Sequence, residues 1–387
     1  MTDRPIYFDY MATTPVDPSV IDVMLKYLGP TGEFGNPAST THVYGLNAAL
    51  AVDNARASIA DLLNASPDEI IFTSGATEAN NLGIIGAALF YQNKGRHVIT
   101  MTTEHKAVLE SFAHLETLGF EVTYLAPEPD GLLSLDALKA AIRKDTILVS
   151  VMFANNEIGV IQDIAAIGQC VKQHGIIFHV DAAQAVGKLP IDLQQLPVDL
   201  LAISSHKCYG PKGMGALYVR QKPKIRLLHQ TFGGSQERGL RAGTLATHQI
   251  AGLGHACLIA KQVMTEESAR ILALRTRLWA GIKDLPNVWF NGHPEKRLAG
   301  NLNITLSGID GESLKLALNA LALSTSSACA SASVKPSYVL RAIGLSEADA
   351  LSSLRLSFGR FTTVDEIDKA IALFNEQIPR LQAMSPR

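Results

Sequence analysis

Short apolar runs rich in β-branched residues alternate with helix-like segments between about residue 70 and residue 220, and this alternation limits the folds open to the chain. Strands separated by helices predict βαβ units, and therefore a mostly parallel sheet covered by helices on both faces. We expect an α/β chain with a seven-stranded sheet. The predicted strands are Glu69–Thr73, His97–Met101, Glu121–Leu125, Thr146–Met152, Gly175–Val180, Leu200–Ser204 and Gly215–Arg220, and the predicted helices are Glu78–Gln92, Lys106–Leu118 and Ile164–His174.

The pattern changes after about residue 250. A helical stretch from Ile250 to about Lys283 contains no proline, and strand-like runs follow at Asn301–Leu306 and Leu354–Ser357. A chain of 387 residues is also longer than one small core requires. We therefore expect a large domain over 16–262, and a smaller α+β domain formed by 1–15 and 263–387.

The composition argues against several classes of protein. The net charge is −2, so the chain has no overall electrostatic footprint for nucleic acid or for an anionic membrane surface. No uncharged apolar run reaches the roughly 18 residues that span a bilayer, and the first residues lack the profile of a signal peptide. The four cysteines form no CxxC pair, which suits a reducing compartment. We expect a cytoplasmic protein, with Cys170 and Cys257 in its core.

One segment, Ser324–Lys335, has the biased sequence STSSACASASVK. Its small side chains cannot anchor a core, so we expect a mobile surface loop over about 324–336. A linker is the plainer interpretation of such a composition. The single cysteine at its centre, Cys329, makes a chemical role worth considering.

Two charged residues follow neighbouring predicted strands. Lys207 lies just after Leu200–Ser204, and Asp181 ends the strand before it. Ligands of open parallel sheets bind beyond the carboxyl ends of the strands, where a lysine can form a Schiff base with an aldehyde cofactor. A carboxylate beside it could keep the nitrogen of a pyridine ring protonated. Taken singly, Lys207 could be a surface lysine and Asp181 a helix cap; together they indicate pyridoxal 5′-phosphate (PLP).

Other strand ends carry groups that suit the same cofactor. Thr73–Glu78 combines a strand end, a glycine turn and a helix start, which can bind a phosphate or form a simple capping box. His105 could lie flat on a cofactor ring and shuttle protons there as a catalytic residue, although a histidine after a strand is more often a cap. Asn156 follows a further strand, where an amide could bond the ring or the substrate, although loop asparagines are also ordinary turn residues.

Eight motifs occur together in one order along the chain. They are FGNPAS (34–39), TSGATE (73–78), TEHKAV (103–108), NNEIG (155–159), HVDAAQ (179–184), HKCYGPKG (206–213), RAGT (241–244) and SSACASAS (326–333). With them the chain resembles the cysteine desulfurases of the IscS/NifS type, which belong to the class V aminotransferases among the fold type I PLP enzymes. The resemblance extends from Tyr7 to about Pro386. Many motifs in one order are far more specific than any one of them.

The resemblance implies a role for each matching residue. Lys207 would bind PLP covalently and later move the substrate Cα proton, and His105 would stack on the ring. Arg355 would bind the substrate carboxylate, for which a planar guanidinium is well shaped, although a surface ion pair is the plainer interpretation. The remaining implied contacts are Asp181 to the pyridinium nitrogen, Gln184 to the phenolic oxygen, Ala76, Thr77, Ser204 and His206 to the phosphate, Thr244 to the phosphate from a second subunit, Asn156 to ring and substrate, and Asn36 to substrate.

The implied reaction centres on Cys329. The resemblance identifies it as the cysteine that attacks the substrate sulfur, which yields a Cys329 persulfide and L-alanine. An ordinary thiol is only a few per cent ionised at neutral pH, so Cys329 would need a nearby base or the substrate's own ionisation. The implied enzyme is a homodimeric sulfurtransferase that passes sulfur to acceptor proteins, such as an iron–sulfur scaffold or a sulfur carrier for tRNA thiolation.

Some features depart from the family pattern. Ser205 stands where glycine is usual, and Cys208 stands where an apolar residue is typical; we expect Cys208 to pack rather than react. Members of this type usually continue past the Ser-Pro at 385–386 with a tail that docks the scaffold, whereas only Arg387 follows here. An aminotransferase, a selenocysteine lyase and a catalytically inactive scaffold protein are the alternatives. The cysteine in the small-residue loop argues against the first, and the intact set of reactive residues argues against the last.

Overall fold

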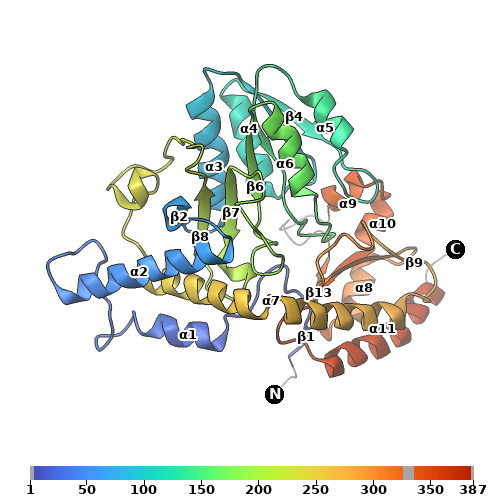
Figure 1. The fold of residues 1–387 in the computed structure, drawn as a ribbon. Helices are drawn as coiled ribbons and strands as arrows, with labels where there is room; N and C mark the ends of the chain where they lie inside the picture. Colours follow the sequence, from blue (N-terminus) through green and yellow to red (C-terminus); the bar gives the residue numbers. More distant parts are fainter. Residues whose placement is uncertain (1–3, 326–334, 385–387) are drawn as a thin grey trace.

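The computed structural model describes residues 4–325 and 335–384 (Figure 1). Its centre is a seven-stranded sheet in the order β2-β8-β7-β6-β5-β3-β4. β8 runs antiparallel to both of its neighbours, and the pairings from β7 to β4 are all parallel. The strands are β2 (Ile70–Thr73), β3 (His97–Met101), β4 (Glu121–Leu125), β5 (Thr146–Ser150), β6 (Ile177–Asp181), β7 (Leu200–Ser204) and β8 (Gly215–Val219).

Helices cover both faces of this sheet, because successive strand residues point to opposite faces and both sets are apolar. In β7, Leu201 and Ile203 join one buried cluster, whereas Leu200 and Ala202 join another. Side chains from α3 and α4 complete the second cluster, and those from α2, α6 and α7 complete the first. These helices and the short α5 are α2 (Val43–Leu62), α3 (Ala76–Tyr91), α4 (Lys106–Thr117), α5 (Leu135–Ala141), α6 (Ile164–Gln173) and α7 (Thr247–Ile282).

A smaller α+β unit contains a four-stranded antiparallel sheet in the order β12-β13-β10-β9. The N-terminal strand β1 joins this unit by pairing in parallel with β11. Apolar residues of α7 and α11 cover the sheet, so that the unit has its own core. The elements are β1 (Ile6–Tyr7), β9 (Val288–Phe290), β10 (Asn301–Leu306), β11 (Leu321–Ala322), β12 (Ser324–Thr325), β13 (Ser353–Ser357), α8 (Gly311–Ala317), α9 (Tyr338–Ala342), α10 (Glu347–Leu351) and α11 (Val364–Met384).

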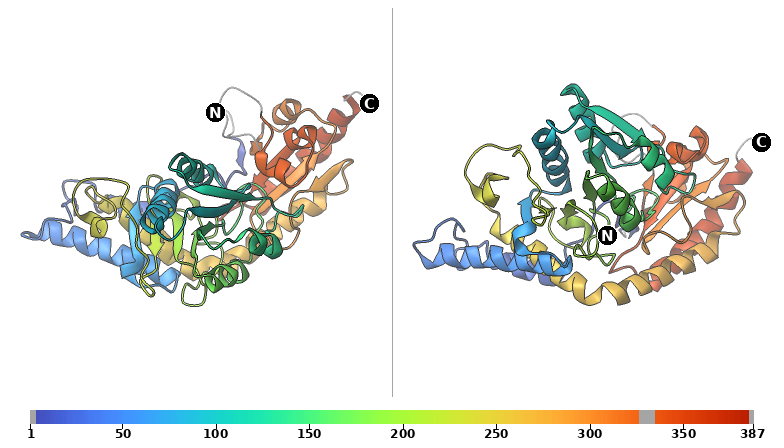
Figure 2. Two further views of the ribbon diagram at one scale, coloured as in Figure 1. Left: turned by 90° about the horizontal axis from the view of Figure 1, so that it is seen from above. Right: turned by 45° about the horizontal axis from the view of Figure 1, so that its top comes forward.

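The long helix α7 connects the two units. Its first half packs in the core of the central sheet through Ile250 and Leu253, and its second half packs in the smaller core through Leu274 and Leu278. Figure 2 shows it running beneath both units. In the same views α2 extends to one side as an arm, with α1 (Pro18–Leu25) packed on α7 beside it. Within residues 4–325 and 335–384, no helix is both long and apolar enough to cross a membrane.

The observed architecture confirms the predicted α/β class. All seven predicted strands of the central sheet occur, with ends that differ from the prediction by at most two residues. Cys170 and Cys257 are buried in the core as predicted, and Cys208 is also buried. The predicted boundary between 262 and 263 falls inside α7, and the division into 16–262 against 1–15 and 263–387 stays a prediction.

Candidate active site

A cavity of about 670 Å³ opens where the parallel strands of the central sheet end. Five strands (β2, β3, β5, β6 and β7) lead at their carboxyl ends into residues that line it, which is the usual place for a ligand in an open α/β sheet. The lining includes ten residues predicted from the sequence: Ala76, Thr77, His105, Asn156, Asp181, Gln184, Ser204, His206, Lys207 and Arg355.

Lys207 lies at the floor of the cavity, in a short turn (Ser205–Lys207) that directly follows β7. Its Nζ donates hydrogen bonds to the carbonyl oxygens of Met11 and Ala12, each at 2.6 Å. These carbonyls belong to the N-terminal segment, which passes from the smaller unit to the edge of the central sheet. The amine is therefore held inside the cavity rather than extended into solvent.

Asp181 ends β6, the parallel neighbour of β7, as predicted. Its side chain is 4% exposed. One carboxylate oxygen accepts a hydrogen bond from Asn80 Nδ2 at 2.8 Å, and the other accepts one from the backbone N–H of Ala183 at 2.9 Å. The two donors fix the direction of this buried carboxylate.

His105 caps the N-terminus of α4 and faces the cavity. Its Nδ1 accepts the backbone N–H of Ala107 at 3.1 Å, so the proton of the neutral ring is on Nε2. Partial desolvation by the surrounding protein lowers the pKa of His105, although the residue stays open to the cavity; Asp181 opposes this change and Lys207 adds to it. At neutral pH the ring is an uncharged, flat surface beside the lysine and the carboxylate.

The start of α3 forms a cradle for an anion. Gly75 precedes the helix with φ 153°, and in the described part of the chain no side chain caps this N-terminus. A Cβ added at Gly215 in β8 would lie 2.6 Å from the Cα of Gly75, so glycine lets the two segments approach closely. The first backbone N–H groups of the helix, at Ala76 and Thr77, therefore remain available for a phosphate.

His206 lies on the same side of the cavity. Burial lowers its pKa to about 4, with the positive charges of Lys207 and Lys212 contributing in the same direction. Its Nδ1 lies 3.1 Å from Thr13 Oγ1. His206 is thus neutral at pH 7 and can offer a hydrogen bond, but no positive charge, to an anion held at the start of α3.

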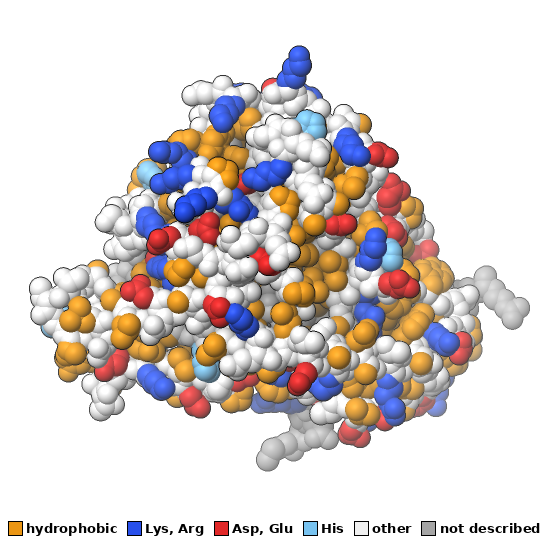
Figure 3. All heavy atoms as spheres, in the orientation of Figure 1, with side chains coloured by type: hydrophobic (Ala, Val, Ile, Leu, Met, Phe, Trp, Pro, Cys, Tyr) orange, Lys and Arg blue, Asp and Glu red, His pale blue; other side chains and the backbone are white. Residues whose placement is uncertain are grey.

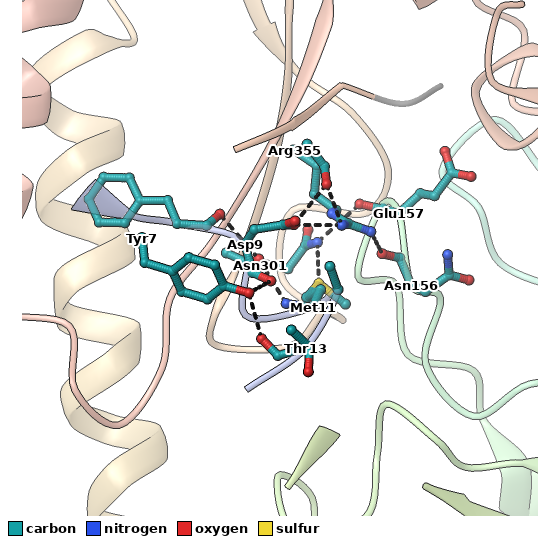
Figure 4. Close-up of polar contacts among 12 residues, drawn as sticks. Tyr7, Asp9, Met11, Thr13, Asn156, Glu157, Asn301 and Arg355 are labelled. Atoms are coloured by element: carbon teal, nitrogen blue, oxygen red, sulfur yellow. Dashed lines mark hydrogen bonds and ion pairs between the residues drawn. The ribbon is translucent and has the colours of Figure 1, made fainter. Parts of the chain in front are cut away.

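Arg355, from β13 of the smaller unit, forms the opposite wall (Figure 4). Its guanidinium donates to Asp9 Oδ1 at 2.7 Å, to Ser324 Oγ at 2.9 Å and to the backbone oxygen of Asn156 at 2.8 Å. Its buried Nε–H has no partner within the described ranges. Among the described residues, the guanidinium thus keeps its Nε–H unused beside an ion pair that is mostly shielded from solvent.

Two further groups lie in the loop after β5. Asn156 Oδ1 is buried without a hydrogen-bond partner among the described residues, which leaves an acceptor for a ligand. The Glu157 carboxylate accepts a hydrogen bond from Ser337. Burial raises the pKa of Glu157 to about 7, against the opposing effects of Ser337 and Arg355. Figure 4 shows the Glu157 side chain pointing away from Arg355, so it does not compete with Asp9 for the guanidinium.

Two predicted residues, Asn36 and Thr244, lie elsewhere. They line a different pocket of about 220 Å³ beside α2, and neither lines the large cavity of the same chain. Cys329 lies outside the described residues. The position of Thr244 is compatible with the prediction that it acts from a second subunit. Asn36 does not line the large cavity of its own chain, so its predicted contact with substrate stays a prediction.

Sequence reasoning missed several residues of the site. Asp9, Met11 and Ala12 belong to an N-terminal segment without a helix or strand pattern, so nothing in the sequence alone placed them at the cavity. Asn80 reaches Asp181 from the middle of α3. Its position could have been found, because it follows Ala76 by four residues and therefore lies on the same face of the helix.

Comparisons with known proteins show which family and fold the chain shares. The sequence matches the family described as Aminotransferase class-V over residues 6–370. It is 59% identical over 382 residues to a Colwellia psychrerythraea protein named cysteine desulfurase IscS, across 99% of this chain and 95% of that protein. A solved NifS-like protein superposes with a TM-score of 0.90 at 34% identity, covering 97% of this chain and 100% of the other. A structure described as SspA in complex with cysteine superposes at 0.82 with 39% identity, covering 92% and 100%.

Proposed function

The chain belongs to the aminotransferase class-V family, in which its similar relatives are cysteine desulfurases, and we propose that it uses PLP to convert L-cysteine to L-alanine and transfers the sulfur to Cys329. The observation that carries the proposal is that the Lys207 amine and the buried Asp181 carboxylate line one cavity from the ends of neighbouring strands. The relative solved in complex with cysteine supports this substrate.

The donor set of the cavity fits PLP. It offers an amine for the aldehyde, a buried carboxylate for the ring nitrogen, an uncapped helix start for the phosphate and the unpartnered Asn156 Oδ1. When bound, PLP supplies an electron sink that weakens bonds at the substrate Cα and Cβ. The proposed contacts are Lys207 to the aldehyde, Asp181 to the ring nitrogen, Gln184 to the phenolic oxygen, His105 on the ring face, and Ala76, Thr77, Ser204 and His206 on the phosphate.

Substrate binding and proton transfer are assigned to side chains of the protein. Arg355 binds the substrate carboxylate, for which it retains an unused Nε–H, and Asn156 and Asn36 complete substrate binding. The Lys207 amine, which would hold PLP in the resting enzyme, would take the substrate Cα proton and keep it close to the substrate. The neutral His105 ring leaves the proton on Lys207 rather than competing for it at pH 7.

Cys329 acts as the nucleophile. Its thiolate attacks the substrate sulfur; an S–S bond forms and the Cβ–S bond breaks, with the bonding electrons left on the carbon side. Two protons, one of them carried by Lys207, complete L-alanine. L-Cysteine and the Cys329 thiol thus become L-alanine and a Cys329 persulfide, with no outside oxidant or reductant.

We propose that the active unit is a homodimer in which Thr244 reaches the phosphate of the partner's site. The arm and its surroundings expose large apolar side chains, including Leu25 at 59%, Phe34 at 55%, Val43 at 60% and Phe232 at 87%. A monomer rarely exposes so many, and burial in a dimer would explain them. Figure 3 shows hydrophobic side chains gathered on the projecting end of the molecule.

Mixed dimers test this arrangement. A K207A protomer combined with a T244A protomer gives one site with both changes and one site with neither, if Thr244 acts across the interface. Purified heterodimers should regain about half of the native activity, and a random 1:1 mixture about a quarter. If Thr244 acted within its own chain, each site would carry one change and the mixture would stay as inactive as its parents.

The persulfide then passes to an acceptor protein, such as an iron–sulfur scaffold or a sulfur carrier for tRNA thiolation. A cytoplasmic location suits this role, because Cys170, Cys208 and Cys257 are free thiols. Isolation of proteins that take labelled sulfur from the loaded enzyme would identify the acceptor.

The primary test measures cofactor and products together. Purified protein should have the visible absorbance of lysine-bound PLP, and L-cysteine with a reductant should give sulfide and L-alanine in equal amounts. In the C329S variant the absorbance should persist while sulfide release stops. Native-like sulfide release by C329S would contradict the assigned nucleophile, and protein that binds no PLP would contradict the function.

A further inference from the structure

The partly buried Lys188, which lines a small cavity separate from the large one, has no role in the proposed reaction. Its Nζ donates a hydrogen bond to Gln184 Oε1 at 2.8 Å. Across residues 4–325 and 335–384, no carboxylate lies within ion-pair distance of it; Glu267, which lines the same small cavity of about 50 Å³, is paired with Arg360 instead. Burial lowers the pKa of Lys188 to about 7, and the positive charge of Lys207 acts in the same direction.

The surroundings of Lys188 would suit an apolar side chain better. The small cavity is lined mainly by apolar groups, among them Met264, Ile271, Leu298 and Phe358. An unpaired interior ammonium destabilises a folded protein, because it loses water without gaining a counter-ion. A residue that opposes folding in this way points to a role other than packing.

The hydrogen bonds of Gln184 indicate that role. Its Oε1 is turned toward Lys188, so its Nε2 points the other way and donates to the carbonyl oxygen of Met11 at 2.9 Å. The same Met11 oxygen accepts a hydrogen bond from Lys207 at 2.6 Å. An amide nitrogen carries two N–H groups, so a second donor remains for a ligand in the cavity that Gln184 lines.

We propose that Lys188 is a positioning residue that locks the Gln184 amide with its nitrogen toward the cavity. This inference rests on the proposed function, in which Gln184 bonds the phenolic oxygen of PLP. Without Lys188 the amide can turn by half a rotation and present its oxygen to the phenolic oxygen. An N–H donor stabilises the ionised phenolic oxygen, whereas a carbonyl repels it. Loss of the donor would therefore raise the proton affinity of the Lys207 nitrogen, which is conjugated with that oxygen through the ring.

The test is a pH titration of the visible absorbance of PLP-loaded protein in native and K188M forms. Methionine is unbranched, is one atom shorter than lysine and suits the apolar cavity, so K188M should fold, with a Tm equal to or above the native value at pH 7. The apparent pKa of the absorbance change should rise by roughly one unit, as expected for the loss of one hydrogen bond to the ionised oxygen. Surface Lys261, paired with Asp61, provides the matched control, and K261M should leave the titration unchanged.

The positive charge of Lys188 could also act on Lys207 directly, without Gln184. Repeating the titration in a Q184L protein separates the two effects. In a Q184L protein, which has no amide to orient, adding K188M should produce no further shift. An equal shift in both backgrounds, or an unshifted titration in K188M with native Gln184, would overturn the proposal. Failure of the native protein to show any PLP absorbance would instead contradict the proposed function, so the two failures are distinguishable.

Discussion

The two walls of the large cavity are built in different ways. On one wall, Lys207, Asp181, His105 and the start of α3 follow directly from strand ends of a single sheet. On the other, Arg355 from β13 meets Asp9, which lies 346 residues earlier in the chain. The sheet wall holds the groups that perform chemistry, and the opposite wall holds the group that recognises the substrate. Substitutions in the sheet wall should therefore lower kcat, and substitutions in the opposite wall should weaken substrate binding.

The largest effect is expected from K207A. This change removes both the attachment of the cofactor and the group that moves the Cα proton, so kcat should fall by at least about 10²–10⁴-fold. Steady-state alanine formation measures the effect, and circular dichroism checks the fold. If K207A retained more than a tenth of native kcat, the reaction would not depend on Lys207, and the assignment of the chemistry to the sheet wall would be wrong.

Changes at Arg355 should act on substrate binding instead. R355A loses charge-assisted hydrogen bonds, each with a contribution of about 1.5–3 kcal/mol, so kcat/KM should fall roughly 10- to 150-fold, mainly through KM. R355K keeps the charge but loses the planar fork and should recover only part of the loss. An unchanged KM with a lower kcat would show that Arg355 acts on the chemical step rather than on substrate binding, which would contradict the proposed roles of the two walls.

A smaller effect is expected from N80A, which tests how the sheet wall is supported. The variant removes the donor that holds one oxygen of Asp181, and the affinity for PLP should weaken by about 10-fold. Neighbouring Asn81, whose amide bonds the Thr77 carbonyl instead, gives the control variant N81A. Equal losses in the two variants would mean that the helix, rather than the contact with Asp181, is responsible.

The last prediction concerns stability rather than activity, at the opposite wall. The pKa of Glu157 is raised by burial from 4.5 to about 7, so its contribution to stability is full below about pH 4.5 and is lost as the pH rises through about 7. E157Q should therefore raise the free energy of unfolding by up to about 3 kcal/mol at pH 8 and change it little at pH 4.5. Urea unfolding at both pH values measures this. The same difference at both would exclude ionisation as the cause.

The same contrast explains what could be predicted from the sequence. The central sheet could be predicted because strand-like and helix-like segments alternate along the chain. The placement of Lys207 and Asp181 follows from the rule that ligands bind where parallel strands end. Both signals are local in the sequence. Asp9, Met11 and Ala12 were not predicted, because their places depend on long-range contacts of an irregular segment. Likewise, nothing in the sequence showed that the resemblance-derived Asn36 would lie beside Thr244 and away from the large cavity.

Lys188 shows a further limit of sequence reasoning. A lysine after a turn reads as a surface residue, and only its hydrogen bond to Gln184 and the lack of an ion-pair partner in the described part of the chain give it significance. Such information comes from burial and tertiary contacts rather than from periodicity.

The most direct test of the account follows the sulfur atom itself. Native protein exposed to L-cysteine without reductant, then digested and analysed by mass spectrometry, should carry one extra sulfur on the peptide containing Cys329, with one L-alanine formed for each sulfur bound. L-Alanine formed without sulfur on Cys329, or sulfur found on Cys208 instead, would contradict it.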